Sequence, residues 1–222
     1  MSTLYIVATP IGNLKDVTLR ALAVLKQVDL IACEDTRVTQ KLLQHHQISK
    51  PLVSFHQHSR LQKVEWLVEQ VRRGKNVALV TDAGTPAISD PGWLLVREAV
   101  DEGVKVEVIP GPSALTAAVS VAGLPLDNFL FLGFLPHKKG RQTIFKQIAE
   151  SEYPVIFYES PHRILKTLQS LAEVVPEREI VVTRELTKIF ETIYRGSIAE
   201  IMQKIINDKK QQKGEFVIIV NR

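Results

Sequence analysis

The sequence predicts an α/β protein of two α/β domains, with a mostly parallel sheet in the first domain and a mixed sheet in the second. In the first half, short apolar runs typical of buried strands alternate with amphipathic stretches typical of helices, and the connections are short. This alternation is typical of a parallel sheet with helices between its strands. In the second half, a short gap at residues 184–188 separates two strand-like runs, which indicates a hairpin and therefore antiparallel pairing.

The elements of the first half follow from the spacing of apolar residues. The residues expected to form strands are 4–8, 30–33, 77–80 and 104–109. The first helix is expected where apolar side chains share one helical face, at Leu19, Leu22, Leu25 and Val28. A second helix is expected to run to about residue 45 with Thr36 as its cap. The further helices are expected over residues 61–73, 94–100 and 113–121.

The second half reads in the same way. The residues expected to form strands are 129–134, 155–158, 180–183, 190–195 and 216–220. The residues expected to form helices are 143–149, 164–174 and 198–206. Because the pattern changes between residues 111 and 128, we assign residues 1–112 to an N-terminal α/β domain and residues 113–222 to a C-terminal α/β domain.

The composition is that of an ordinary globular protein. Hydrophobic residues make up 45% and charged residues 23% of the 222 residues, which argues against a disordered chain or a coiled coil. The net charge of +4 permits an anionic partner. Cys33 is the single cysteine, so an intrachain disulfide is excluded and a reducing compartment fits best. Prolines and glycines interrupt the uncharged stretch at residues 108–126, so we expect a cytoplasmic protein without a membrane segment. The histidines show no metal-ligand spacing except the group at 45, 46, 56 and 58, which is more typical of a solvated surface, so we expect no metal site.

Two glycine-bearing bends are the strongest candidates for a ligand site. Residues 82–92 and 110–114 each follow an expected strand, at the end of a parallel sheet where ligands bind. Gly84 lets a ligand approach the backbone closely, and the bend at 110–114 presents N–H groups at a helix start. The alternatives are a structural loop with a helix cap at Ser89 and an ordinary helix start. The sequence lacks G-x-G-x-x-G after the first strand, Walker A and G-x-S-x-G motifs.

A family resemblance rests on segments that occur in a fixed order. They are ATPIGNL at residues 8–14, DAGTP at 82–86 with SDPG at 89–92, PGPSA at 110–114, GFLP at 133–136 and ESPHR at 159–163. With these segments the chain resembles, over essentially its whole length, the branch of the tetrapyrrole methylase superfamily that methylates ribose in small-subunit ribosomal RNA. Members of this branch usually continue past the final strand into a small helical extension, which is absent from this sequence.

The resemblance implies a fold, a cofactor and a substrate. It implies a homodimer in which S-adenosylmethionine binds in a cleft between the two domains, and methylation of the 2′-hydroxyl of a cytidine in the decoding region of 16S ribosomal RNA. The substrate is then the RNA itself or the small ribosomal subunit. The residues that the resemblance places at the cofactor are Pro10, Ala83, Gly84, Thr85, Ser113, Ala114, Glu159, Leu186 and Phe216.

The ribose hydroxyl is a poor acid and must lose its proton during methyl transfer. The side chains considered for this task are Asp35, Glu159, His162, Glu185, Lys188 and Glu191. We favour Lys188 or Glu185, since a desolvated lysine can act as a base, and we keep Glu159 as a further candidate. The alternation of Glu and Lys around these positions is equally typical of a solvated face.

Phosphate contacts should dominate RNA binding. The expected donors are Arg37, Arg60, Lys138, Lys139, Arg141, Arg163 and Arg184, of which residues 138–141 belong to a basic loop without acidic neighbours. Lys209, Lys210 and Lys213 read instead as a solvated turn. Two alternatives stay open: a methyltransferase of the same fold that acts on a tetrapyrrole or another small molecule, and an RNA-binding α/β module without catalytic activity.

Overall fold

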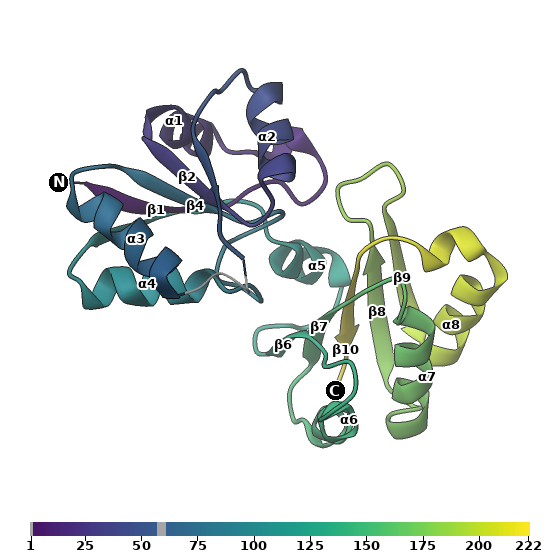
Figure 1. Ribbon diagram of the computed structural model, residues 1–222. Helices are drawn as coiled ribbons and strands as arrows, with labels where there is room; N and C mark the ends of the chain where they lie inside the picture. The colour runs from purple at the N-terminus through teal and green to yellow at the C-terminus, as the bar shows by residue number, and fades with distance from the viewer. Residues whose placement is uncertain (1, 57–60) are drawn as a thin grey trace. The chain divides into compact units, whose positions relative to one another are not determined.

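The chain folds into two compact units. A computed structural model describes residues 2–56 and 61–222, and its contacts divide the chain into a first unit that ends at Ser113 and a second unit, Ala114–Arg222. Each unit is a sheet with helices packed on it (Figure 1). The predicted fold class, two α/β domains with a parallel and a mixed sheet, is confirmed.

The described strands of the first unit form a parallel sheet in the order β3-β2-β4-β1-β5. They are β1 (Thr3–Val7), β2 (Leu30–Cys33), β3 (Leu52–Ser54), β4 (Val77–Val80) and β5 (Lys105–Ile109). Every residue of β2 and β4 is buried, which explains why these strands are continuous apolar runs. The edge strand β3 was not predicted from the sequence, because its three residues are only partly buried or exposed.

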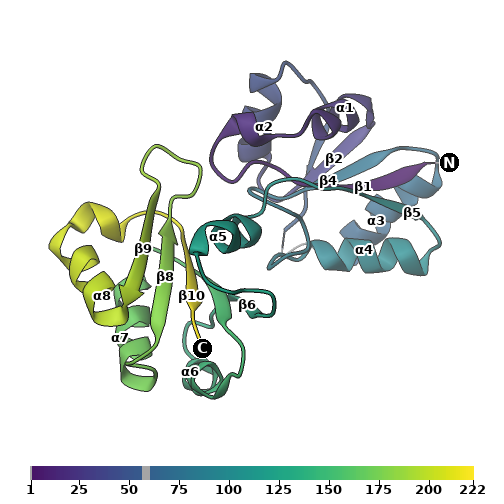
Figure 2. The same cartoon turned by 180° about the vertical axis from the view of Figure 1, so that it is seen from behind.

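Helices cover both faces of this sheet. They are α1 (Leu19–Gln27), α2 (Thr36–His45), α3 (Leu61–Arg72) and α4 (Gly92–Asp101), and a short 3₁₀ helix, η1 (Leu14–Asp16), precedes α1. One core joins α1 and α2 to the sheet through Leu25 and Leu43, and a second core joins α3 and α4 through Leu67 and Leu95. Figures 1 and 2 show these two pairs of helices on opposite sides of the strands.

The cap of α2 differs from the prediction. Thr36 is the first residue of the helix, and Asp35 is the N-cap, because its side chain accepts a hydrogen bond from the amide of Arg37. Both residues are good N-caps by type, so the sequence alone does not decide between them. At α1 the side chain of Thr18 accepts from the amide of Ala21, at 3.0 Å.

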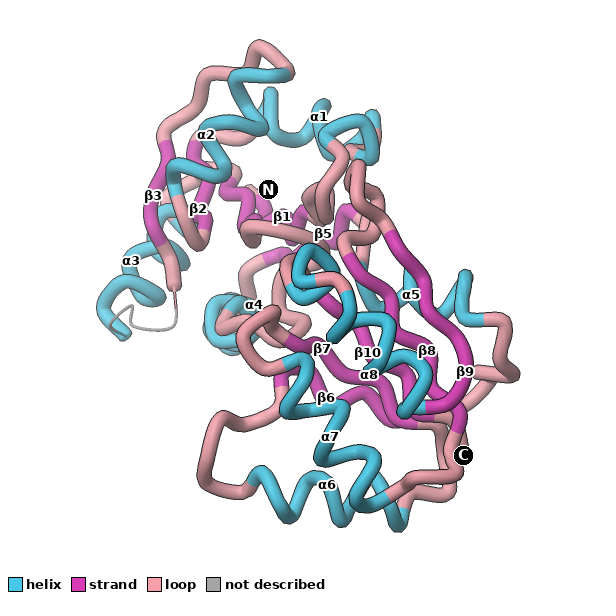
Figure 3. The backbone as a smooth tube through the Cα atoms, turned by 90° about the vertical axis from the view of Figure 1, so that its right-hand side faces the viewer, coloured by secondary structure: helices cyan, strands magenta, loops and turns pink. Residues whose placement is uncertain are grey.

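The second unit contains a mixed sheet in the order β6-β7-β10-β8-β9 among its described strands (Figure 3). These are β6 (Leu130–Phe134), β7 (Val155–Glu159), β8 (Glu179–Arg184), β9 (Thr192–Ser197) and β10 (Phe216–Val220). The β6–β7 pair is parallel, whereas β10 pairs antiparallel with β7 and β8. β8 and β9 form the predicted antiparallel hairpin.

Three helices bury one face of this sheet. The helices of the unit are α5 (Ala114–Ala122), α6 (Arg141–Glu150), α7 (Ile164–Val174) and α8 (Ile198–Asn207), with a 3₁₀ helix, η2 (Lys209–Gln212), after α8. A single core joins α6, α7 and α8 to the sheet through residues such as Ile148, Leu168 and Ile201. α5 lies beside β10, on the side of the sheet away from α7 and α8 (Figures 1 and 2).

The uncharged stretch at residues 108–126 folds as the end of β5, a turn and α5, which is the strand, turn and helix that the sequence predicts. Each piece is therefore part of one of the two units rather than one long apolar segment. In the part of the chain that the structure describes, no helix combines the length and the apolar composition that crossing a bilayer requires.

Candidate active site

The loops after β1 and β4 are joined at the carboxyl edge of the first sheet. The amide of Thr9 donates to the carbonyl of Gly84 at 2.9 Å, and the amide of Gly84 donates back to the carbonyl of Thr9 at 3.0 Å. The hydroxyl of Thr9 also donates to the carbonyl of Thr81 at 3.0 Å, and Thr9 is buried. These bonds fix the start of the bend at residues 82–92 against the first loop.

The two glycine-bearing bends meet, as the sequence predicts. The hydroxyl of Thr85 donates to the carbonyl of Pro112 at 3.2 Å. Gly84 has a φ of +83°, and a Cβ atom there would lie 3.5 Å from Ile11 Cγ2, 3.8 Å from the Pro112 oxygen and 4.0 Å from Ser113 Cα. A side chain at position 84 would therefore point into the space where the three loops converge. Parallel strands end at one edge of a sheet, which is why loops distant in sequence meet here.

The predicted cofactor residues of the first unit come together at this edge. Gly84, Thr85 and Ser113 lie at the convergence, and Pro10 and Ala83 directly adjoin the bonded pair Thr9 and Gly84 in the chain. The site they form is neutral and built largely from backbone, with a glycine where a side chain would fill the convergence of the loops. That arrangement fits a ligand held by close approach to the main chain.

Asp90 holds the rest of this bend in shape. Its Oδ1 accepts hydrogen bonds from the amides of Ala87, at 2.9 Å, and Gly92, at 2.7 Å. Ala87 and Ser89 have φ values of 69° and 66°, a strained region for residues other than glycine that is common at functional sites. Burial raises the pKa of Asp90, and these two bonds oppose the rise. The alternative of a helix cap at Ser89 is wrong, because α4 begins at Gly92 after an N-cap at Pro91.

An acidic cluster lies at the start of this bend, where Asp35, one of the candidate bases, meets Asp82 and Glu34. The amide of Asp35 donates to Asp82 Oδ1 at 2.9 Å, and the hydroxyl of Thr81 donates to Glu34 Oε2 at 3.0 Å. Burial raises the pKa of Asp82, the Asp35 amide opposes this, and the nearby carboxylates add to it. Hydrogen bonds from Arg37 lower the pKa of Asp35 to about 2. Among the described residues, no group of His, Cys, Asp or Glu is arranged to hold a metal ion.

In the second unit, Glu159 is fully engaged in an interior network. One carboxylate oxygen accepts from the amide of Ser160, at 2.6 Å, and pairs with Arg163 at 2.8 Å, and the other accepts from the hydroxyl of Thr167 at 2.6 Å. Arg141 donates to the same hydroxyl at 2.7 Å. The Glu159 side chain is completely buried. We call these five residues the Glu159 network, and its bonds give Glu159 a structural task.

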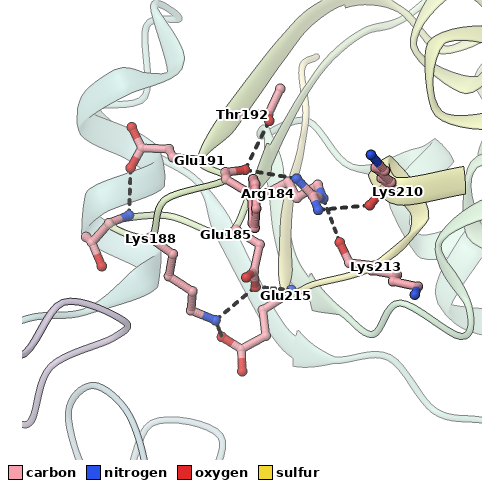
Figure 4. A network of polar contacts seen from close by, with 10 residues as sticks. Arg184, Glu185, Lys188, Glu191, Thr192, Lys210, Lys213 and Glu215 are labelled. Atoms are coloured by element: carbon pink, nitrogen blue, oxygen red, sulfur yellow. Dashed lines mark hydrogen bonds and ion pairs between the residues drawn. The ribbon is translucent and has the colours of Figure 1, made fainter. Parts of the chain in front are cut away.

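Glu185 and Lys188 form a second polar group, with Glu215, at the end of β8 (Figure 4). The Lys188 ammonium lies 2.9 Å from Glu185 Oε1 and 3.0 Å from Glu215 Oε2. Burial lowers the pKa of Lys188, but its bonds to the two carboxylates outweigh this, and the net pKa is raised. Burial raises the pKa of Glu185, and the bonds from Lys188 and the Glu215 amide outweigh it, so the net pKa is lowered. Both shifts favour the charged ion pair.

The backbone around this pair is strained and crowded. Glu185 and Thr187 have φ values of 51° and 67°, and Leu186 between them is only 9% exposed. Gly214 has a φ of +107°, and a Cβ atom there would overlap the side chain of Glu185. Phe216, which the resemblance places at the cofactor, is 2% exposed and belongs to the core of the unit.

Three arginines predicted to contact RNA lie inside the second unit instead. Arg141 and Arg163 belong to the Glu159 network, and Arg141 is 8% exposed. Arg184 is 6% exposed, and its guanidinium donates to the carbonyls of Lys213 at 2.6 Å, Phe190 at 2.9 Å and Lys210 at 2.9 Å (Figure 4). Because these donors bond to the protein itself, we leave the three arginines out of the proposed RNA surface.

The other predicted RNA contacts are distributed as follows. Lys138 and Lys139 are exposed in the loop before α6. The Arg37 side chain is 86% exposed and pairs with Asp35 at 2.5 Å. Arg60 lies outside the described residues. Among the described residues, Lys138 and Lys139 are therefore the predicted donors that are exposed and form no ion pair.

The fold and the converging loops define the class of protein. Residues 3–202 match the family of Tetrapyrrole (Corrin/Porphyrin) Methylases, and the chain belongs to this family. A solved structure of cobalt precorrin-4 methyltransferase is similar to this fold, with a TM-score of 0.71 and 19% identity, over 99% of this chain and 94% of that one. At that identity the likeness concerns the fold alone.

Within the family, two relatives with the same name are much more similar in sequence. The ribosomal RNA small subunit methyltransferase I of Thermotoga maritima is 43% identical over 100% of this chain and 99% of the relative. The protein of that name from Vibrio cholerae is 51% identical over 98% of this chain and 76% of the relative. The resemblance found from the sequence motifs is thus confirmed at the level of the family and extends to these relatives.

Proposed function

We propose that this chain is an S-adenosylmethionine-dependent methyltransferase that modifies the 2′-hydroxyl of a cytidine in the decoding region of 16S ribosomal RNA. The observation that carries the proposal is the identity of 43% and 51% to relatives named for methylation of small-subunit ribosomal RNA, over nearly the whole chain. A cytoplasmic location, consistent with a ribosomal RNA substrate, is part of the proposal. The homodimer implied by the resemblance is part of the proposal and is checked by sedimentation.

The first unit supplies the groups that would hold the methyl donor. The cradle is the convergence of the bends at Gly84, Thr85 and Ser113, where a Cβ atom on Gly84 would contact Ile11, Pro112 and Ser113. The carboxylate of Asp82, in this bend, would favour a cationic ligand, whereas that of Asp35 is already paired with Arg37. When bound, S-adenosylmethionine supplies a methyl group on a sulfonium cation. The residues present therefore fit this cofactor, and their task is to hold and orient it.

Lys138 and Lys139 are proposed to hold RNA phosphates, and replacing both by alanine should weaken RNA binding without affecting cofactor binding. Each lost phosphate contact lowers the slope of log affinity against log salt by about 0.7 for a single strand, so the slope should fall by about 1.4. Anisotropy titrations at several salt concentrations measure this. The matched control, Lys209→Ala with Lys210→Ala, removes two exposed lysines of the same unit and should change nothing. Equal loss of RNA and cofactor affinity would contradict the assignment.

We propose that Lys188 or Glu185 accepts the proton that the ribose hydroxyl loses. Lys188 accepts a proton only after losing its own, and its two ion pairs raise the pKa above the ordinary value of about 10.4. A base of this kind predicts a methyl-transfer rate that rises about tenfold per pH unit from about pH 7 to about pH 9. Lys188→Met should remove that rise, and Lys166→Met, on the exposed face of α7, should keep it. A flat profile in the unmodified protein would exclude Lys188 as the base.

The proposed function is tested by methyl transfer itself. The purified protein is incubated with S-adenosylmethionine carrying a radioactive methyl group and with small ribosomal subunits, and the RNA is digested to nucleosides. Label in 2′-O-methylcytidine is the expected result. Label in an added tetrapyrrole precursor but not in RNA would favour the small-molecule alternative. Binding of RNA without any binding of S-adenosylmethionine in calorimetry would favour the non-catalytic module.

A further inference from the structure

A β-bulge in the edge strand β6 gathers three aromatic side chains on one face of the second sheet. Side chains alternate along a regular strand, so Phe131 and Phe134 would point to opposite faces. The pairing of β6 with β7 shifts register between these two residues, at Gly133, whose φ is +60°. Both phenylalanines consequently contact Tyr158: the ring centroid of Phe131 lies 5.1 Å and that of Phe134 5.3 Å from the Tyr158 ring centroid. Bulges of this kind re-aim a side chain.

The re-aimed ring of Phe134 is exposed rather than buried. It is 57% exposed, whereas the next residue, Leu135, turns into the core and is 2% exposed. Burial therefore does not account for a phenylalanine at this position. A large exposed aromatic ring backed by a second ring is typical of a surface that stacks on a flat ligand.

The loop that follows Phe134 carries the cationic side chains. His137, Lys138 and Lys139 are exposed, and Lys138 is four residues from Phe134, a span of at most about 14 Å. Aromatic rings beside lysines combine the two features by which proteins bind single-stranded nucleic acid: a π-face for a base and a positive charge for the phosphates. No acidic residue lies between residues 134 and 141.

The Glu159 network fixes the base of this loop. Arg163 donates to the carbonyl of Leu135 at 2.7 Å, and Arg141 donates to the carbonyl of Pro136 at 3.4 Å. Both arginines are held by Glu159, directly or through Thr167. The buried network thereby attaches the start of the loop to β7 and α7, which fixes the position of residues 135–136 between the Phe134 ring and the lysines.

We propose that Phe134, backed by Tyr158, stacks on a base of single-stranded RNA whose phosphates contact Lys138 and Lys139. The inference deepens the proposed function, on which it rests, by naming a contact to an unpaired base beside the phosphate contacts. The exposed ring and the adjoining positive charge are complementary to this ligand, whereas a purely apolar ligand would offer the lysines no negative charge.

The test uses the full chain and a short single-stranded RNA of mixed sequence that carries fluorescein at one end and 2-aminopurine inside. Phe134→Ala should weaken binding about fivefold or more, reduce the quenching of 2-aminopurine, and leave the salt dependence of binding unchanged. Phe134→Trp should restore both signals. Tyr153→Ala removes a ring of similar exposure, 53% against 57%, at the other end of β7 and should have no effect.

Three results would overturn the inference. They are wild-type affinity in Phe134→Ala, no binding of this RNA by the unmodified protein, and a change in sedimentation of Phe134→Ala with RNA binding intact, which would assign the ring to contacts with a second copy of the chain. Methyl transfer to small subunits by the unmodified protein reports separately on the proposed function. A protein that methylates RNA but is indifferent to Phe134→Ala refutes the stacking contact alone.

Discussion

Replacing Gly84 by valine is expected to reduce the affinity for S-adenosylmethionine at least tenfold, that is, by about 1.4 kcal/mol or more, through lost contact and added strain. The φ of +83° disfavours a branched side chain, and the added methyl groups would extend toward Ile11 and Pro112, where the bends converge. Isothermal titration calorimetry measures the affinity, and circular dichroism checks that the variant is folded. An unchanged affinity in a folded variant would refute the placement of the cofactor at this bend.

Backbone strain alone is separated from lost ligand space by a matched control. Gly74 has a φ of +95° in the same unit, and a Cβ atom there would have no neighbour within 4 Å. Gly74→Val therefore imposes a similar strain, of order 1–3 kcal/mol, without entering the convergence of the bends. We expect Gly74→Val to lower the free energy of unfolding while cofactor affinity is kept, which assigns the loss in Gly84→Val to the site.

Replacing Glu159 by alanine is expected to lower the free energy of unfolding by about 3–5 kcal/mol, the usual cost of removing one partner from a buried ion pair. The change would leave Arg163 without its carboxylate and the Thr167 hydroxyl without its acceptor, both in the interior of the second unit. Urea denaturation measures the effect. Glu159→Gln keeps the shape and should cost less, with a methyl-transfer rate close to that of the unmodified protein.

An exposed ion pair of the same spacing provides the control. Glu150 lies 3.6 Å from Lys146, four residues apart on α6, and both side chains are mostly exposed. Glu150→Ala should change the free energy of unfolding by about 1 kcal/mol or less, because solvent screens such pairs. If Glu159→Gln instead abolished methyl transfer with full stability, Glu159 would be a catalytic residue and its interior bonds would be incidental.

The fold was predictable where burial leaves a continuous apolar run. The strands at residues 30–33, 77–80 and 216–220 were predicted at their observed bounds, because every residue in them is buried. The edge strand at Leu52–Ser54 was missed, since a partly exposed strand of three residues leaves no such pattern. Caps were also unpredictable, because Asp35 and Thr36 are adjacent residues of equally suitable type.

The meeting of the bends could be predicted, since the topology of a parallel sheet alone brings Gly84 and Pro112 to one edge. The roles of the arginines could not. The sequence does not distinguish a basic residue that faces solvent from one such as Arg141 or Arg163, whose guanidinium bonds to protein groups that include partners distant in the sequence. The bulge at Gly133 left one signal, a glycine inside a strand-like run, which marks a bulge without showing what it re-aims.

The crowding of Gly214 by Glu185 means that these two positions cannot vary independently. Any side chain at 214 must displace the carboxylate that pairs with Lys188, so Gly214→Ala should also disturb the ion pair. Conversely, shortening residue 185 would open room at 214 but leave the Lys188 ammonium with Glu215 alone. Substitutions at the two sites should therefore show strongly non-additive effects in a double-mutant cycle, with the double variant less impaired than the sum of the single ones.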